Sequence, residues 1–320
     1  MLSITARRGE EWITDIQAHD LCKWVEGKKA LLWIDVERPT EEDLALLTEQ
    51  FGFHPLAMED VRGDHQRPKV DLYEGYALLV FYAVSYDATQ EGIDLHELEM
   101  FIGHNYVVTI HDGPIEELRE THARWEQNVA HMGEDMGILL YSILDTILDN
   151  YFPVLDWIAE QLDTLEGAIF SEFDTAVMKA LLKLKQDLLR LRRVVGPHRD
   201  VVNMLLRGEQ GILPAAALPY LQDLYDHALR IVEGVDMYRE MISTVMDGFL
   251  SVQSNNINEV MQRLTIINLL FLPLAVLTGF FGMNFEMLPF DSPAILLLAL
   301  MSMVALPTGL YLWLRWKGWG

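Results

Sequence analysis

Two long uncharged stretches near the C-terminus set the main constraint on this chain. No Asp, Glu, Lys or Arg occurs between residues 264 and 285, and none occurs between residues 292 and 314. A helix needs about 20 mostly apolar residues to cross the hydrocarbon core of a bilayer. We therefore expect a membrane protein with two spans, at about 264–284 and 292–314, and a soluble part before them.

Basic residues predict how these spans are oriented. Arg263 precedes the first span, Arg315 and Lys317 follow the second, and the loop 285–291 contains no Lys or Arg. Lys and Arg concentrate on the cytoplasmic side of membrane proteins. Residues 1–12 are polar and charged, unlike a signal peptide. We expect both termini in the cytosol and the loop outside, in a multi-pass protein of the plasma (inner) membrane.

Composition narrows the classes of partner. The 320 residues include 48 acidic and 24 basic side chains, for a formal net charge of −24. This balance argues against a nucleic-acid partner, because nucleic-acid-binding surfaces are basic. The acidity fits equally well a solvated surface and a reservoir that concentrates cations near a pathway. Cys22 is the only cysteine, so an intrachain disulfide is not possible.

Motifs of common enzymes are missing from the sequence. It contains no P-loop, no GxGxxG, no HExxH and no serine or cysteine elbow. The ten His residues are scattered, and we expect His54, His65 and His104 to be surface or capping residues. The sequence therefore predicts a protein that is not an enzyme, with no catalytic residues and no cofactor. A membrane-anchored binding or scaffold protein is the non-transport alternative.

The soluble part combines strand and helix patterns, so we expect an α+β membrane protein. An α/β domain is predicted for residues 1–135, a helical stalk for 136–262 and a transmembrane domain for 263–316. Strands are predicted at 30–36, at 76–86 and as a pair within 98–110, where Gly103–Asn105 form the turn. Helix starts are expected at Thr40 and Pro114.

From Gly137 onward the apolar residues recur at helical spacing. One helix is expected from Ile138 to Phe170 and a second from Asp174 to Leu206, followed by a break over 208–219. No helix breaker stronger than a lone Gly follows until Pro273, so one helix is expected from Leu221 through the first span. Such a helix has about 60 residues and a length of roughly 90 Å.

A stripe of side chains lies along one face of this long helix, because residues three or four apart share a face. Two spans cannot enclose a polar pathway, so a pore requires several copies in which each stripe residue forms a ring. The stripe consists of Asn258, Met261, Leu264 (or Thr265 at the same level), Asn268, Leu272, Ala275 and Gly279.

The tripeptide Gly282-Met283-Asn284, at the end of the first of two C-terminal spans, resembles the CorA family of divalent-cation channels. The resemblance covers nearly the whole chain and implies a homopentamer with a funnel-shaped cytosolic domain, whose first span lines the pore. It rests also on Asn258–Met261, Leu264–Ile267, Pro273-Leu274, Gly279, Phe285-Glu286, Pro289, His54-Pro55, Glu59-Asp60, Gln66–Lys69 and Tyr225–His227.

The resemblance implies a role for each residue at the outer mouth. Asn284 forms a ring whose amide carbonyl meets the hydrated ion without a permanent charge that would trap it. Gly282 lets the backbone turn closely, and Met283 packs behind the ring. Glu286 and Asp291 in the outer loop either attract cations or are simply solvated.

Deeper in the pore, Asn268 is either a polar ring or the partner in a hydrogen bond between helices. The apolar side chains of Met261, Leu264 and Leu272 can form constrictions that gate by dewetting. Asp247 can ring the cytosolic entrance.

The family is gated by its own ion, bound between neighbouring cytosolic domains. The matching positions are Glu59 and Asp60 on one subunit, with Asp223 and Asp145 across the interface. Facing carboxylates repel one another unless a divalent cation lies between them, so a fall in internal Mg2+ would let the subunits move apart.

The family carries Mg2+, and some members carry Co2+ or Ni2+. The related ZntB branch is associated with Zn2+. Ala275 stands where a Thr is common and Leu272 where a Met is common, so the sequence leaves Zn2+ open as the alternative. It also leaves open the direction of transport and the choice between passive and proton-coupled transport. Membrane lipids are the other expected partners.

Overall fold

The computed structural model describes residues 2–9, 11–14, 16–27, 30–63, 66–87, 92–127, 135–171, 175–208, 211–283 and 292–318. Contacts divide the chain into two compact units, Met1–Val245 and Met246–Gly320. The finer division at residues 135 and 262 stays a prediction.

A seven-stranded sheet forms the centre of the first unit, in the order β2-β1-β3-β7-β6-β5-β4. β3 and β7 run parallel, and the other neighbouring pairs are antiparallel. The predicted strands are confirmed, while β1, β2 and β4 were not predicted. The strands are β1 Leu2–Arg8, β2 Glu11–Ile13, β3 Leu31–Glu37, β4 Lys69–Tyr73, β5 Tyr76–Asp87, β6 Gly92–Ile102 and β7 Tyr106–His111.

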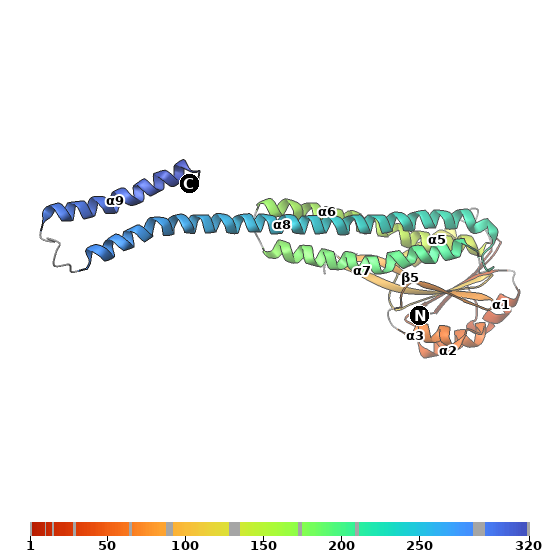
Figure 1. Ribbon diagram of the computed structural model, residues 1–320. Coiled ribbons are helices and arrows are strands. Elements are labelled where there is room, and N and C mark those ends of the chain that lie inside the picture. The colour runs from red at the N-terminus through yellow and green to blue at the C-terminus, as the bar shows by residue number, and fades with distance from the viewer. Residues whose placement is uncertain are drawn as a thin grey trace. The chain divides into compact units, whose positions relative to one another are not determined.

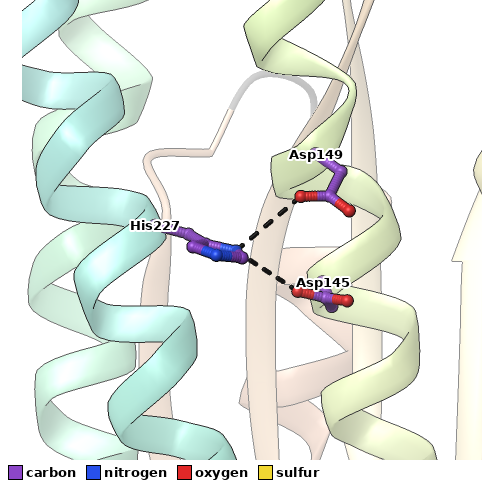
Figure 2. Close-up of side chains that lie close together, drawn as sticks. All are labelled: Asp145, Asp149 and His227. Atoms are coloured by element: carbon purple, nitrogen blue, oxygen red, sulfur yellow. Dashed lines mark ion pairs between the residues drawn. The ribbon is translucent and has the colours of Figure 1, made fainter.

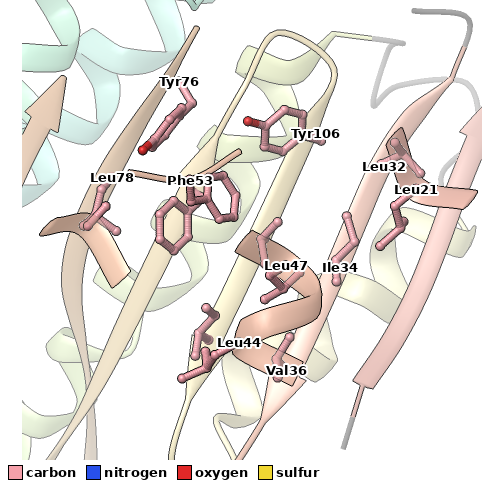
Figure 3. Close-up of a cluster of buried hydrophobic side chains, with 14 of the residues drawn as sticks. Leu21, Leu32, Ile34, Val36, Leu44, Leu47, Phe53, Tyr76, Leu78 and Tyr106 are labelled. Carbon is pink, nitrogen blue, oxygen red and sulfur yellow. The ribbon is translucent and has the colours of Figure 1, made fainter. Parts of the chain in front are cut away.

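The strand register builds a continuous apolar row across one face of the sheet. Ile34 pairs with Val108, Val108 with Phe101, and Phe101 with Leu78. All four side chains are buried in one core cluster. Figure 3 shows Ile34 and Leu78 within this cluster. Each fully buried large apolar side chain contributes about 1.5–3 kcal/mol, so this row fixes the register of four strands.

Three helices cover this face: α1 Leu21–Gly27, α2 Glu41–Phe51 and α3 Pro55–Arg62. The predicted start of α2 is confirmed, because the Thr40 side chain accepts a hydrogen bond from the Asp43 amide and the Asp43 carboxylate accepts one from the Thr40 amide. His54 is a capping residue, as predicted, since its Nδ1 accepts from the Leu56 amide at 3.2 Å. His104 is exposed, and His65 lies outside the described residues.

The opposite face of the sheet packs against helices from α4 to α7 (Figure 1). Phe81 on β5 stacks on the ring of His198 with centroids 3.7 Å apart, and the Tyr82 amide donates to His198 Nε2 at 3.0 Å. The helices are α4 Glu116–Gln127, α5 Met136–Asp149, α6 Tyr151–Ser171 and α7 Thr175–Leu206.

The prediction of one helix from Ile138 to Phe170 is wrong, because α5 ends at Asp149 and α6 begins at Tyr151. Pro153 has no amide hydrogen to give to the carbonyl four residues earlier, which is that of Asp149. Asn150 lies at the junction, and its amide group donates to the Val84 carbonyl at 3.1 Å. The junction between α5 and α6 is therefore held against β5 by this hydrogen bond.

The predicted long helix is confirmed as α8, Leu218–Phe281, with 64 residues, preceded by a 3-10 turn at Ala215–Ala217. α9 spans Pro293–Trp316. Within the described residues, three helical stretches are long and apolar enough to cross a membrane. One of them, Met136–Ala168, has 61% of its most apolar window buried inside the protein, so it is a core element.

The other two are the predicted spans, in α8 and α9. Among the described residues from Met246 onward, only Phe249, Ala299 and Leu314 are buried. Two apolar helices with so little buried surface require lipid or further copies of the chain around them.

Candidate metal centre and membrane helices

A cluster of two carboxylates and one imidazole lies between α5 and α8 in the first unit. His227 Nδ1 lies 3.3 Å from Asp145 Oδ1 and 3.7 Å from Asp149 Oδ1 (Figure 2). The three ligand atoms lie within 4.8 Å of one another, a spacing that suits a shared metal ion. We call Asp145, Asp149 and His227 the His227 cluster.

Helical spacing on both elements builds this cluster. Asp145 and Asp149 are four residues apart, so both project from the same face of α5. On α8, Asp223 and His227 are four residues apart, and Asp223 Oδ1 lies 3.9 Å from His227 Nε2. The hydroxyl of Tyr141 donates to Asp223 Oδ2 at 3.0 Å, which ties the two helices together.

The surroundings of Asp145 disfavour its negative charge. Burial raises the pKa of Asp145. The negative charges of Asp149 and Asp223 raise this pKa further, whereas the positive charges of His227 and Arg124 lower it. Asp145 Oδ1 and His227 Nδ1 are both buried and have no hydrogen-bond partner among the described residues. Buried polar atoms are normally paired, so these two are available as ligands.

The donor set fits a divalent cation. Carboxylate oxygens are the ligands that Mg2+ prefers, and an imidazole nitrogen adds affinity for Co2+, Ni2+ or Zn2+. Asp145 and Asp223 were candidates from the sequence, whereas Asp149 and His227 were not assigned a metal. The available signal was the paired four-residue spacing, Asp145 with Asp149 and Asp223 with His227.

The other predicted regulatory acids, Glu59 and Asp60, lie on α3, which covers the opposite face of the sheet from α5 (Figure 1). Asp60 is bound by Lys69 Nζ at 2.7 Å, and Lys69 also contacts Asp71 at 2.8 Å. Glu59 is exposed. One chain does not bring these acids to the His227 cluster, and their contact with a neighbouring subunit stays a prediction.

The predicted pore stripe follows the part of α8 that lies in the second unit, and Asp247 precedes it as an exposed residue of the same helix. A hollow of about 710 Å3 on α8 is lined by residues from Thr265 to Thr278 that include Asn268, Leu272 and Ala275. All seven stripe residues are exposed: Asn258, Met261, Leu264, Asn268, Leu272, Ala275 and Gly279.

The helix ends just before the tripeptide. The Gly282 amide donates to the Thr278 carbonyl at 2.9 Å. A Cβ at Gly282 would lie 2.9 Å from that carbonyl oxygen, so the close approach requires glycine. Met283 is 56% exposed, and its predicted packing behind a ring would need other chains. Asn284, Glu286 and Asp291 lie outside the described residues.

The sequence matches a protein-family model described as CorA-like Mg2+ transporter protein over residues 28–315. It is 32% identical to the cobalt/magnesium transport protein CorA of Thermotoga maritima, over 80% of this chain and 74% of that protein. The structure matches the complete CorA magnesium transporter of Methanocaldococcus jannaschii with a TM-score of 0.83 and 26% identity, covering 99% of both chains.

A ZntB cytoplasmic domain from Vibrio parahaemolyticus shares the fold less closely, with a TM-score of 0.59 and 16% identity, over 70% of this chain and 88% of that one. The family model matches most of the chain, and the bacterial relative exceeds 30% identity over four fifths of it. The chain therefore belongs to the family of CorA-like Mg2+ transporter proteins.

Proposed function

We propose that this protein transports divalent cations, chiefly Mg2+, through a pore that five copies of the chain build together. The observation that carries the proposal is the exposed stripe on α8, which runs along a candidate membrane span to Gly282. The membership of the chain in the CorA-like family supports it. Both termini and the unit Met1–Val245 lie in the cytosol, at the plasma (inner) membrane.

Several copies are needed because one chain offers only one pore-lining helix. In a five-fold bundle Asn258, Asn268 and Asn284 supply rings of amide oxygens. Met261, Leu264 and Leu272 supply apolar rings between them. Rings of neutral amides hold a hydrated cation weakly enough for it to leave, which conduction requires.

The chemistry of the stripe favours Mg2+ over Zn2+. Between Asn258 and Asn284 the sequence contains neither His nor Cys, which are the usual zinc ligands. The amide oxygens present are hard donors of the kind that Mg2+ prefers. The relative from Thermotoga maritima is named for cobalt and magnesium, and the likeness to ZntB extends to the fold alone. Co2+ and Ni2+ are the expected secondary cargo.

The His227 cluster is the proposed regulatory site, completed in the pentamer by Glu59 and Asp60 of the neighbouring subunit. Without a cation, the carboxylates around His227 repel one another and the acids across the interface. A bound Mg2+ or Co2+ neutralises them and stabilises the closed arrangement of the cytosolic domains. Loss of the ion shifts the population toward the open arrangement.

The transport proposal is tested by Mg2+ uptake into proteoliposomes that contain an internal Mg2+-sensitive dye. Asn268→Leu removes one polar ring and should lower the uptake rate about tenfold while the oligomer still assembles. Leu270→Ile is the matched control, because helical spacing places residue 270 on the other side of α8. If Asn268→Leu took up Mg2+ as fast as the unmodified protein, Asn268 would not line the pore. If the unmodified protein and the control gave no dye response, the transport proposal would be refuted.

The regulatory proposal is tested by thermal unfolding of the full chain, with EDTA and with saturating Mg2+. A ligand at 100 times its Kd stabilises the folded state by about 2.7 kcal/mol. Asp145→Asn should therefore lose most of the Mg2+-induced rise in apparent Tm. Asp226→Asn, one residue from His227 but exposed on α8, should keep it. An unchanged Mg2+ response in the Asp145→Asn protein would exclude the cluster as the regulatory site.

A further inference from the structure

A second polar site lies in the unit Met1–Val245, between α6 and α7 at the end of β5. It is a pocket of about 270 Å3 that shares no residue with the His227 cluster or with the stripe on α8. Trp157 and Gln161 are four residues apart on α6, and Lys183 and Asp187 are four residues apart on α7, so each pair lies on one face of its helix, toward the pocket. The residues that matter here are Tyr86, Trp157, Gln161, Lys183 and Asp187.

Asp187 is the unusual member of this pocket. Its side chain is 8% exposed, and Oδ2 is buried without a hydrogen-bond partner among the described residues. The other oxygen, Oδ1, lies 3.8 Å from Arg190 Nη1, which is longer than a hydrogen bond. Burial raises the pKa of Asp187, while Arg190 and Lys183 lower it. A buried carboxylate is costly unless a donor reaches it, and the pocket provides room for that donor.

The aromatic wall of the pocket favours a cation. The rings of Tyr86 and Trp157 lie with centroids 4.2 Å apart, and both line the cavity. Aromatic faces attract positive charge, and Trp does so most strongly. Gln161 adds an amide carbonyl that can accept a hydrogen bond from an ammonium group.

We propose that this pocket binds a small organic cation, an alkyl- or arylammonium ion with a single positive charge. The ammonium donates to the Asp187 carboxylate through Oδ1, which has no hydrogen bond from Arg190, and to the Gln161 carbonyl. The hydrocarbon part lies against Trp157 and Tyr86. Lys183 on the rim and Arg190 near Asp187 disfavour a second positive charge on the ligand. The volume, a little below the range of about 300–1,000 Å3 common for drug-sized ligands, limits the ligand to a compact molecule.

Other ligand classes fit the pocket less well. A divalent metal ion would find one lining carboxylate and two aromatic rings, whereas such ions take several oxygen ligands. An anion would face the carboxylate of Asp187. A neutral aromatic molecule could use the rings but would leave that carboxylate without a donor.

The test is calorimetric titration of the full-length protein in detergent, with EDTA present, using phenethylammonium chloride as the probe. One saturable site per chain is expected. Asp187→Asn keeps the shape of the side chain and removes its charge, so it should weaken binding at least about tenfold. Trp157→Leu should weaken binding as well. Asp163→Asn, exposed on α6, is the matched control and should bind like the unmodified protein.

Phenethyl alcohol, the neutral analogue of the probe, distinguishes a site that selects a cation from an apolar cavity without charge selectivity. It should bind much more weakly than phenethylammonium. The proposal is overturned if the alcohol binds as tightly as the amine, if Asp187→Asn leaves the affinity unchanged, or if the titration shows no saturable heat. Circular dichroism of each variant confirms that the fold is retained, and removal of a buried charge without a hydrogen-bond donor favours folding of Asp187→Asn.

Discussion

Glu99 is a carboxyl group buried inside the sheet of the first unit. It lies on β6 between Val80 and Ile110 on the neighbouring strands and is 7% exposed. Burial, with a smaller contribution from Glu97, raises the pKa of Glu99 from 4.5 to about 8. The folded protein therefore keeps a proton on Glu99 at pH values where the unfolded chain has lost it.

The sign of the effect on stability follows from this difference. Below about pH 4.5 the group is protonated in both states and costs nothing. As the pH rises toward 8 the folded state binds one more proton than the unfolded state, so the unfolding free energy falls by up to about 1.4 kcal/mol per pH unit. Over that window the total loss is about 3–5 kcal/mol.

Glu99→Gln removes the titrating group and should remove this loss. For a unit of this size about 1 kcal/mol shifts Tm by roughly 2–4 °C. The apparent Tm of the variant should thus exceed that of the unmodified protein by about 10 °C at pH 8, and the difference should shrink toward pH 5.

The assay is thermal unfolding of the full chain in detergent, followed by intrinsic fluorescence over a series of pH values. Glu120→Gln, an exposed position on α4, is the control and should give a difference in Tm that does not depend on pH. Carboxylates far from Glu99 titrate equally in both proteins and cancel in the comparison. A pH-independent difference between Glu99→Gln and the unmodified protein would refute the assignment of a raised pKa to Glu99.

Three further predictions concern the same unit and are checked by apparent Tm. Burial lowers the pKa of His198 to about 3. As the pH falls below about 6.5, the unfolded chain takes up a proton at this position and the folded protein does not, so stability is lost. The apparent Tm of His198→Gln should therefore fall less than that of the unmodified protein between about pH 6 and pH 4. A Cβ at Gly103 would lie 2.1 Å from the ring of Tyr106, whereas one at Gly113 meets nothing within 4 Å. Gly103→Ala should therefore destabilise the protein by about 2 kcal/mol or more, and Gly113→Ala by much less. Thr40→Ala removes the cap of α2 and should cost about 1 kcal/mol, and an unchanged Tm would deny the capping role.

The strands that the sequence predicted are those with a strong local pattern. The run 76–86 is rich in aromatic and β-branched residues, and 98–110 contains a recognisable turn at Gly103. β2 has three residues, and β4, Lys69-Val-Asp-Leu-Tyr73, has two charged side chains among five residues. Both are edge strands, which become strands by pairing with a neighbour rather than through their own composition.

At the break between α5 and α6, the local pattern predicted too much regular structure rather than too little. Apolar spacing continues through it, so periodicity alone predicted one helix. Pro153 was the local signal that a hydrogen bond to Asp149 had to be absent. The contact of Asn150 with Val84 on β5 then holds the junction in place, and that contact is visible only in three dimensions.

The candidate metal site was predictable only in part. Family resemblance pointed to Asp145 and Asp223, and four-residue spacing could have added Asp149 and His227. Tyr141 and Asp223 are 82 positions apart along the chain, however, so no local pattern could place α5 beside α8. The partner of Asp60 was similarly hidden, because Asp60 lies on α3 and Lys69 on β4, and their contact appears only in three dimensions.

α8 contains both His227 and the predicted pore stripe in a single uninterrupted helix, and this continuity separates two kinds of effect. A change at Asp145 removes a proposed cation ligand beside α8 but leaves every stripe side chain in place. It should therefore alter how internal Mg2+ inhibits uptake without altering the maximal rate. A change at Asn268 modifies the stripe and leaves the His227 cluster intact, so it should lower the maximal rate and preserve the inhibition curve. If both variants changed both properties equally, regulation and permeation would share one site, and the assignment of gating to the His227 cluster would fail.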